Sequence, residues 1–279
     1  MSARILGGRE VAAQVRAEAV ARLRVHLARG GLAPRVRAFA VDPDGGARSY
    51  LETQQKAAAA VGLQFRPEVV MGPITTGEAR RRLEDLSADP GVDGILLSWP
   101  LPPELEAERV LEGLDPGKDV DALTPPCLGR LAIDPGARAP ATARAVMAVL
   151  TQAGADLVGS RVTLVGKGRT AGMPSMLLLF HAGAMVTVVH RRVHDVPGAV
   201  RTADVVVSAA GAPGLVQARD VRPGAVVVDV GTTEVDGRLR GDVEPAVSAV
   251  ASAYAPVPGG VGPVTVSYLL LNALEVVGA

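Results

Sequence analysis

The chain has 279 residues, 48% of them hydrophobic and 21% charged, a composition typical of a packed globular protein with two α/β domains or one large one. Lys and Arg number 29 together, as do Asp and Glu, so no global positive field attracts nucleic acid or an anionic membrane, and we expect neither as a partner. The single cysteine, Cys127, excludes an internal disulfide and suggests no metal site. Because the sequence also shows no signal-peptide core and no apolar run of membrane-spanning length, we expect a cytoplasmic protein.

Predicted helices and strands alternate along the first half of the chain. Helical spacing or helix-forming composition predicts helices over residues 10–29, 49–61 and 76–87. Short apolar runs predict strands at Arg35–Val41, Glu68–Met71 and Gly94–Leu97. The last of these runs into Trp99-Pro100-Leu101-Pro102-Pro103, which neither a helix nor a central strand can continue. The alternation predicts a mostly parallel sheet with helices on both faces.

A second α/β series follows a stretch rich in Pro and Gly, residues 125–140, which is the best candidate for a domain boundary. Its strands are predicted at Val162–Val165, Met185–Val189, Val205–Ala209 and Ala225–Val230. Pro258 to Pro263 is predicted to be a loop, and Val264 to Val277 a final helix. The fold class is therefore α/β, with two domains.

A glycine-rich turn after the first strand of the second series predicts a dinucleotide site. Gly166, Gly168 and Ala171 give the pattern G-x-G-x-x-A, with Gly172 following at the start of a helix. Glycine permits the tight turn and lets the backbone approach a pyrophosphate, to which the helix offers free N–H groups. An idle glycine turn is the alternative, but the preceding strand and following helix favour binding.

Basic residues at the end of the next strand indicate which dinucleotide is bound. An NAD site usually has Asp or Glu there to take the ribose hydroxyls, whereas a 2′-phosphate calls for cations. This chain has His190, Arg191 and Arg192, and Lys167 lies in the glycine turn. The alternative is that the two arginines are ordinary solvated charges. Their position favours NADP as the cofactor.

Several segments in order along the chain together resemble the bifunctional methylenetetrahydrofolate dehydrogenase/cyclohydrolase family. They are Tyr50 with its helix, Asp93 to Leu96, Lys118 to Asp121, Gly129 to Leu131, Val165 to Pro174, Asp229 to Gly231, Gly241 to Val243 and Pro256 to Thr265. The resemblance implies a catalytic, folate-binding domain over residues 1–138, completed by a C-terminal helix over residues 264–279. It implies a Rossmann-type NADP-binding domain over residues 139–263, a cleft between the two domains, and a homodimer.

Two of the positions that depart from the family pattern lie at the expected substrate site; the others are Ala122, Lys167 and Gly168, where the family has Gly, Arg and Ser. The family has Tyr and, four residues later, Lys on one helix; here Tyr50 is present but the Lys position is Gln54. Lys56 cannot replace that Lys, because two residues along a helix correspond to a rotation of about 200°. The Gln that interacts with the Lys in the family is Ser98 here. The resemblance thus places Tyr50, Gln54 and Ser98 at the substrate.

Other residues match the family. Asp121, which hydrogen-bonds the pterin ring in the family, is retained, and a carboxylate can accept two parallel hydrogen bonds from an aminopyrimidinone. The resemblance assigns Pro258, Gly259 and Gly260 to substrate binding and Thr232 to cofactor binding, beside the glycine turn and the arginines.

The resemblance implies oxidation of 5,10-methylenetetrahydrofolate to the methenyl form with hydride transfer to NADP, followed by hydrolysis to 10-formyltetrahydrofolate. Hydride transfer needs orientation but no obligatory protein acid or base, whereas hydrolysis needs proton transfer, which Gln54 cannot perform. We therefore expect a dehydrogenase whose cyclohydrolase step is weak or lost. The alternatives are a fully bifunctional enzyme using another base, an altered folate-like substrate, and a non-catalytic NADP- or folate-binding regulatory paralogue.

Overall fold

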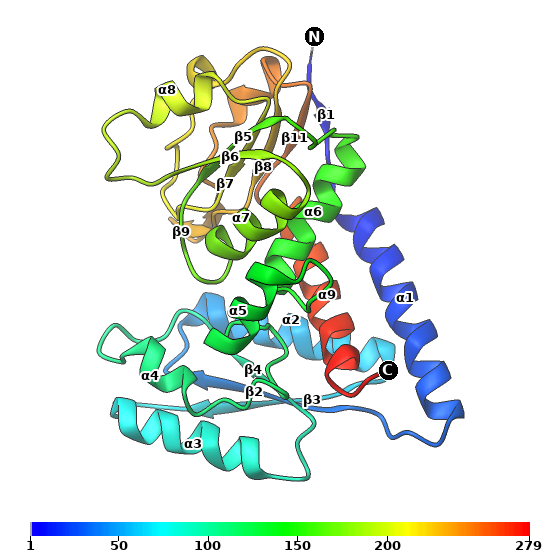
Figure 1. Cartoon of the computed structure of the whole chain (residues 1–279). Helices are drawn as coiled ribbons and strands as arrows, with labels where there is room; N and C mark the ends of the chain where they lie inside the picture. Colours follow the sequence, from blue (N-terminus) through cyan, green and yellow to red (C-terminus); the bar gives the residue numbers. More distant parts are fainter. Residues whose placement is uncertain (1) are drawn as a thin grey trace. The chain divides into compact units, whose positions relative to one another are not determined.

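The computed structural model describes residues 2–279, which divide into two compact units (Figure 1). The N-terminal unit contains residues 15–130 and 266–279, and the C-terminal unit contains residues 2–14 and 131–265. Three helices have residues in both: α1 (Arg9–Ala28), α5 (Pro125–Ile133) and α9 (Val261–Val276). No helix in this described part of the chain is long and apolar enough to cross a membrane.

The N-terminal unit is built on a three-stranded parallel sheet in the order β3-β2-β4. The strands are β2 (Arg35–Val41), β3 (Gln64–Val70) and β4 (Gly94–Leu97), and the helices are α2 (Gly45–Val61), α3 (Thr76–Ala88), α4 (Ala107–Leu111) and α5 (Pro125–Ile133). Alternation along the strands gives the sheet two buried faces. Phe39 and Ile95 face α3 and α4, whereas Val36 and Leu96 face a small pocket that Leu270 of α9 also lines.

The C-terminal unit contains a six-stranded parallel sheet in the order β1-β11-β8-β7-β5-β6. Its strands are β1 (Arg4–Ile5), β5 (Arg161–Val165), β6 (Met185–Val189), β7 (Val205–Ser208), β8 (Val226–Asp229) and β11 (Ala253–Ala255). Its further helices are α6 (Ala141–Ala153), α7 (Gly172–His181) and α8 (Val196–Arg201), and β9 (Thr233–Val235) and β10 (Arg238–Arg240) form a hairpin. The chain passes from β5 outward to β6 and then back to β7 on the other side. Doubly wound sheets bind ligands at such a reversal, beyond the carboxyl ends of the strands.

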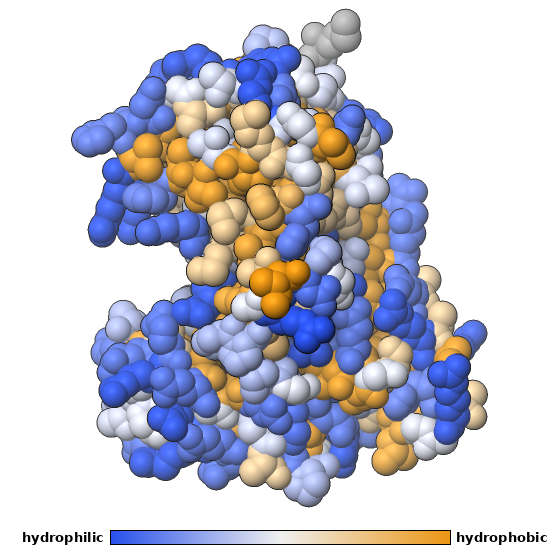
Figure 2. Space-filling view, in the orientation of Figure 1, coloured by the Kyte–Doolittle hydropathy of each residue, from blue (hydrophilic) through white to orange (hydrophobic). Residues whose placement is uncertain are grey.

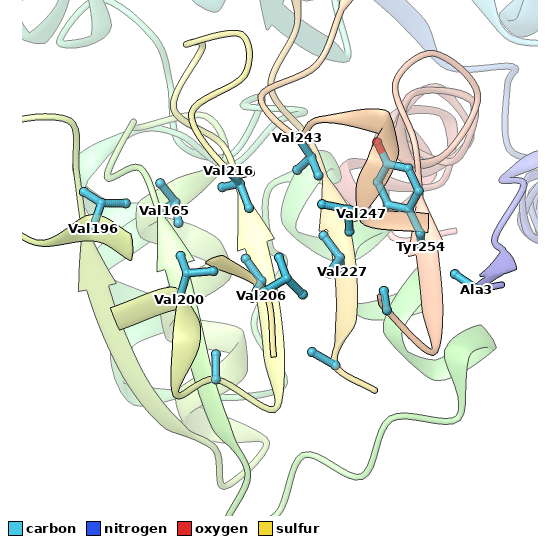
Figure 3. Close-up of a cluster of buried hydrophobic side chains, with 14 of the residues drawn as sticks. Ala3, Val165, Val196, Val200, Val206, Val216, Val227, Val243, Val247 and Tyr254 are labelled. Carbon is cyan, nitrogen blue, oxygen red and sulfur yellow. The ribbon is translucent and has the colours of Figure 1, made fainter. Parts of the chain in front are cut away.

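The core on one face of this sheet consists mostly of valine, with alanine and one tyrosine. Val206 and Val227 from the sheet pack with Val200 of α8 and with Val216 and Val243 from the loops beyond the strands (Figure 3). β-Branched side chains suit strands that are buried on both faces, which explains the continuous apolar runs in the sequence. This core anchors the loops at the carboxyl end of the sheet.

The α/β class, the parallel sheets and the strands Arg35–Val41, Gly94–Leu97 and Met185–Val189 are confirmed. The predicted start of the second helix was wrong: α2 begins at Gly45, because Asp44 caps it by accepting the N–H of Ala47 at 2.7 Å. The third strand also begins earlier, at Gln64, and includes Pro67; β3 lies at the sheet edge, where proline is tolerated.

Two predicted loop regions contain helices. Residues 125–140 were predicted as a boundary stretch, but α5 occupies the first part of it, with prolines in its opening turn, where their missing N–H groups cost nothing. The final helix begins at Val261 rather than Val264, with Gly262 and Pro263 inside its first turn for the same reason.

The compact units divide after Arg130, whereas the predicted domain boundary lies between residues 138 and 139. Residues 2–14 also group with the C-terminal unit, because β1 pairs in parallel with β11, Arg4 opposite Ala253 and Ile5 opposite Tyr254. A two-residue strand carries no sequence signal strong enough to predict such pairing.

Candidate active site and cofactor site

Two of the predicted site residues, Tyr50 and Gln54, lie one turn apart on α2. This spacing puts them on the same side of the helix. Tyr50 remains 40% exposed, whereas Gln54 is only 4% exposed. Lys56 is exposed, as its rotation around the helix requires. The structure thus directs Gln54, and not Lys56, toward the interior beside Tyr50.

The pKa of the Tyr50 hydroxyl is shifted by its neighbours. Although the Tyr50 side chain as a whole is 40% exposed, burial of its hydroxyl raises the pKa, the negative charge of Asp121 raises it further, and hydrogen bonding with the Gln54 side chain lowers it by less. Gln54 and the charge of Asp121 therefore both influence this hydroxyl. Because the pKa is raised, this phenol stays protonated at neutral pH and can donate a hydrogen bond, but it cannot serve as a base there.

Gln54 lines the small pocket between the sheet and α9. The other lining side chains are apolar, among them Val36, Leu96 and Leu270. The Oε1 atom of Gln54 is buried and accepts no hydrogen bond within the described chain. Leaving a buried acceptor unpaired costs about 1–3 kcal/mol. Such an atom fits a site in which a ligand supplies the donor.

Ser98 and Trp99 follow directly after β4. The backbone N–H of Ser98 donates to the carbonyl of Phe39 at 2.8 Å, so the residue continues the pairing of β4 with β2. Strand alternation puts Ser98 on the same face as Leu96, which lines the Gln54 pocket. Trp99 packs against the apolar core of α3 and α4.

The segment Lys118–Asp121 runs beside β4 as an additional parallel partner. Ile95 donates to the Lys118 carbonyl at 2.7 Å and accepts from the Val120 N–H at 3.0 Å. A side chain at Gly94 would come within 2.8 Å of a methyl group of Val120, so glycine suits the close packing of the two segments. These contacts fix the backbone that presents Asp121.

A side chain from α9 strengthens this arrangement. Asn272, fully buried and the only asparagine in the chain, donates from Nδ2 to the Val120 carbonyl at 2.9 Å. Asp119, also buried, accepts the backbone N–H of Thr124 at 2.7 Å. Asp119 lies in a segment that resembles the family, but no role was predicted for it or for Asn272. The rarity of asparagine was the one signal that could have pointed to Asn272.

In the C-terminal unit, Gly166 and Gly172 form the turn between β5 and α7. Gly166 has φ of 115°, a conformation that favours glycine, and a side chain there would overlap the carbonyl of Ala209. A side chain at Gly172 would overlap the backbone of Gly166. Gly168 is exposed and faces open space. No side chain caps the N-terminus of α7 within the described residues, which leaves backbone N–H groups for an anion.

The predicted basic residues lie around the carboxyl end of β6. Arg191 and Arg192 are exposed in the loop after that strand, and Lys167 is exposed in the glycine turn after the neighbouring strand β5. The N–H of Arg192 donates to Nδ1 of His190 at 3.2 Å, which gives the loop a defined turn. β5 and β6 are paired in register up to Val165 and Val189, so both loops leave the sheet at the same edge.

The remaining predicted residues also follow strands of this sheet. Thr232 is exposed in the segment after β8. Pro258 and Gly259 are exposed and Gly260 is buried in the segment between β11 and α9. Gly259 accepts the N–H of Gly8 at 2.8 Å, and a side chain at Gly8 would overlap Gly260. The loop is therefore held close to the chain segment after β1.

A pair of buried carboxylates, Asp229 and Asp242, lies at the same end of the sheet, where the strands have their carboxyl ends. Burial raises the pKa of Asp229 to about 7, with the Asp242 charge adding to the effect, although backbone N–H groups of Val243 and Asp242 oppose it. Both residues lie in segments that resemble the family, and no role was predicted for either. Aspartate at the end of an otherwise apolar strand was the available signal.

The comparisons with known proteins agree with this geometry. The model for the tetrahydrofolate dehydrogenase/cyclohydrolase catalytic domain matches residues 6–121, and the model for the NAD(P)-binding domain of the same proteins matches residues 140–279. A bifunctional protein FolD from Thermus thermophilus is 42% identical over 275 residues, covering 99% of this chain and 96% of its own length.

Solved structures give the same result. A FolD structure from Trypanosoma brucei, complexed with NADP and an inhibitor, matches with a TM-score of 0.91 at 36% identity over 99% of this chain and 97% of its own. The bifunctional enzyme from Campylobacter jejuni matches with a TM-score of 0.92 at 30% identity over 99% of both chains. The fold, the dinucleotide turn and the agreement over nearly the whole length lead to one conclusion: the chain belongs to the tetrahydrofolate dehydrogenase/cyclohydrolase family.

Proposed function

We propose that this protein oxidises 5,10-methylenetetrahydrofolate to 5,10-methenyltetrahydrofolate with NADP as the hydride acceptor, and that its cyclohydrolase step is weak or lost. The observation that carries the proposal is the placement of Gln54 one turn from Tyr50 on α2, buried and with an unpaired Oε1 atom, so that an amide stands where the family has an ammonium group. This placement supports binding and orientation of a folate. It offers little for proton transfer.

The oxidation step makes modest demands on the protein. The lone pair of the folate nitrogen expels the hydride, and NADP supplies the acceptor when bound. The side chains then have to hold the pterin ring and orient the reacting carbon. Asp121 can accept hydrogen bonds from the ring, and Tyr50, protonated at neutral pH, can donate one. Both roles survive the replacement of Lys by Gln54.

Hydrolysis of the methenyl cation makes a different demand. Water has to lose a proton as it attacks, and a group that titrates near neutral pH assists this. An amide such as that of Gln54 forms hydrogen bonds but exchanges no proton at ordinary pH. Tyr50 is held protonated, and Lys56 is exposed on a different part of α2. The residues that would supply the base are thus replaced or turned away.

Two alternatives remain to be distinguished. The Thermus relative is named bifunctional, which favours a protein that performs both steps with another base. A non-catalytic NADP- or folate-binding paralogue would perform neither. We expect NADPH to form when methylenetetrahydrofolate and NADP are added to the purified protein, as measured by the absorbance of NADPH. Absence of any NADPH, in a preparation that still binds NADP, would establish the non-catalytic alternative.

Replacement of Arg191 by alanine should weaken NADP binding selectively. Arg191, Arg192 and Lys167 are the cations we assign to the 2′-phosphate, because their loops leave the same sheet edge. A charge-assisted hydrogen bond is worth about 1.5–3 kcal/mol, so the KM for NADP should rise at least about tenfold. The KM for NAD should barely change. Steady-state kinetics with both cofactors measure this, and equal use of NAD and NADP by the unmodified protein would remove the assignment.

We also infer a homodimer, formed through the outer side of the C-terminal unit. Strand β6 is a sheet edge whose side chains Met185 and Val188 are 61% and 36% exposed, and Phe180 at the end of α7 is 67% exposed. Figure 2 shows apolar side chains gathered over this part of the unit. An unpaired apolar edge strand is a surface that natural proteins usually cover, and a second copy pairing edge to edge would do so.

We also infer that the protein is located in the cytoplasm. Its single cysteine, Cys127, is a reduced thiol, which fits that compartment.

A further inference from the structure

The buried carboxylates Asp229 and Asp242 have no role in the substrate and cofactor sites proposed above. Asp229 is the last residue of β8, and Asp242 accepts a hydrogen bond from Ser208, the last residue of β7, which is one of the two strands beside the reversal where a doubly wound sheet receives its ligand. Both are fully buried. Burying an ionised carboxylate is costly unless hydrogen bonds satisfy its oxygens. The groups that donate to these two carboxylates therefore indicate what the pair does.

Asp242 holds the loop that follows β7. Its Oδ2 accepts from the Ser208 hydroxyl at 3.0 Å and from the Ala210 N–H at 2.6 Å, and its Oδ1 accepts from the Ala212 N–H at 2.7 Å. Three donors within five residues of chain are thus gathered on one side chain. A carboxylate is the only side chain of this size with acceptor capacity on both branches.

The loop held by Asp242 supports the glycine turn. Ala209 donates to the carbonyl of Val165 at 2.7 Å, and its own carbonyl lies so close to Gly166 that no side chain fits there. Movement of this loop would therefore change the shape of the turn at which the pyrophosphate is expected. Asp242 reaches the turn only through Ser208 to Ala212.

The backbone at Asp242 is itself held in place by Asp229. Asp229 accepts the N–H groups of Asp242 and Val243, each at 3.0 Å, and Ser208 lies directly beside Asp229 in the register of β7 and β8. Val243 enters the valine core beside Val216, and the carbonyl of Asp242 accepts the N–H of Val216 at 3.1 Å (Figure 3). Gly231 and Gly241 leave room for the two carboxylates, since a side chain at either would overlap one of them.

We propose that Asp242 is a positioning residue for the dinucleotide: by holding Ser208, Ala210 and Ala212 it keeps the loop after β7 against the glycine turn and thereby sets the affinity for NADP. This inference rests on the proposed cofactor site. It also extends to the segment after β8, because the N–H of Gly231, next to Thr232, donates to the carbonyl of Ser208 at 3.1 Å. Asp242 contacts the loop and not the cofactor, so its effect is indirect.

The test is the dissociation constant for NADP, measured by titration calorimetry on the full-length protein without folate. Asp242→Asn keeps the size of the side chain but turns an –NH2 group toward one of the N–H donors. We expect the dissociation constant to rise at least about tenfold, with a binding stoichiometry near one per chain. Unchanged affinity in this variant would overturn the proposal.

The matched control is Asp204→Asn. Asp204 lies in the same unit and pairs with Arg161 and Arg222, but it precedes β7 and so lies at the opposite edge of the sheet. It should lower the melting temperature and leave NADP affinity unchanged, which separates positioning from general destabilisation. A rise in the dissociation constant as large as that of Asp242→Asn would show that any loss of stability produces the effect, and would overturn the proposal.

If Asp242→Asn does not fold, Ser208→Ala decides, because it removes one donor and adds no group. It should raise the dissociation constant about two- to fivefold, less than the loss of a full charged hydrogen bond. An unchanged value would overturn the proposal. Failure of the unmodified protein to bind NADP would instead contradict the proposed function.

Discussion

Replacing Asp121 with alanine should reduce kcat/KM for the folate substrate by at least about 10²-fold, while the affinity for NADP stays the same. We assign the carboxylate to the paired N–H donors of the pterin ring. Two charge-assisted hydrogen bonds at about 1.5 kcal/mol or more each amount to about 3 kcal/mol or more, and each 1.4 kcal/mol is a factor of ten. The two ligands are assigned to different units of the chain, so the loss should be confined to folate.

Two further variants make the result specific. Asp121→Asn should also be poor, because the amide accepts only one of the two hydrogen bonds. Asp93→Ala is the control: Asp93 lies in the same unit, at the opposite end of β4, and forms an ion pair with Arg35 at 2.9 Å. It should lower stability without changing folate kinetics. Normal kinetics in Asp121→Ala would remove this residue from the substrate site.

The parts of the fold that periodicity could predict are those where burial decides the residue type. The buried strand Gly94–Leu97 and the edge strand Met185–Val189 were found at their observed limits, since short β-branched or apolar runs flanked by turn residues have few other structures available. The start of α2 at Gly45 was missed, because Asp44 reads equally well as a turn residue and as a helix cap.

The site was predictable to a different extent in its two parts. Gly166 and Gly172 could be predicted because neighbouring backbone lies so close to each that no side chain fits there. Such a position has to be glycine, so it appears in the sequence as part of a glycine motif. Asp242 and Asn272 could not be given roles, because each acts on backbone groups distant along the chain: Ala212 is 30 residues from Asp242, and Val120 is 152 residues from Asn272. Such partners are set by the three-dimensional fold.

The replacement of Lys by Gln54 leads to the second large effect: the protein should accumulate methenyltetrahydrofolate instead of hydrolysing it. General acid–base assistance contributes about 10²–10⁴-fold, so its absence should leave decay of the methenyl absorbance close to the spontaneous rate. The measurement follows that absorbance with and without protein, at matched pH and buffer. Fast hydrolysis by the unmodified protein would show that this site uses a base other than the residues considered above.

Restoring the step should require two changes at once. Gln54→Lys alone would place an ammonium group in a pocket with apolar walls, where burial lowers the pKa of lysine and disfavours its charge. Ser98, on the same face as that pocket, is too short to reach such a group, whereas Ser98→Gln can offer it an amide. The double variant should therefore hydrolyse the methenyl form faster than the two single variants together predict, as expected for residues that act as a unit.

Lys56→Gln is the control, since Lys56 is exposed and its loss should change neither step. A double variant no faster than the better single variant, with dehydrogenase activity intact, would mean that Ser98 and Gln54 are not coupled and that the second step was lost for another reason.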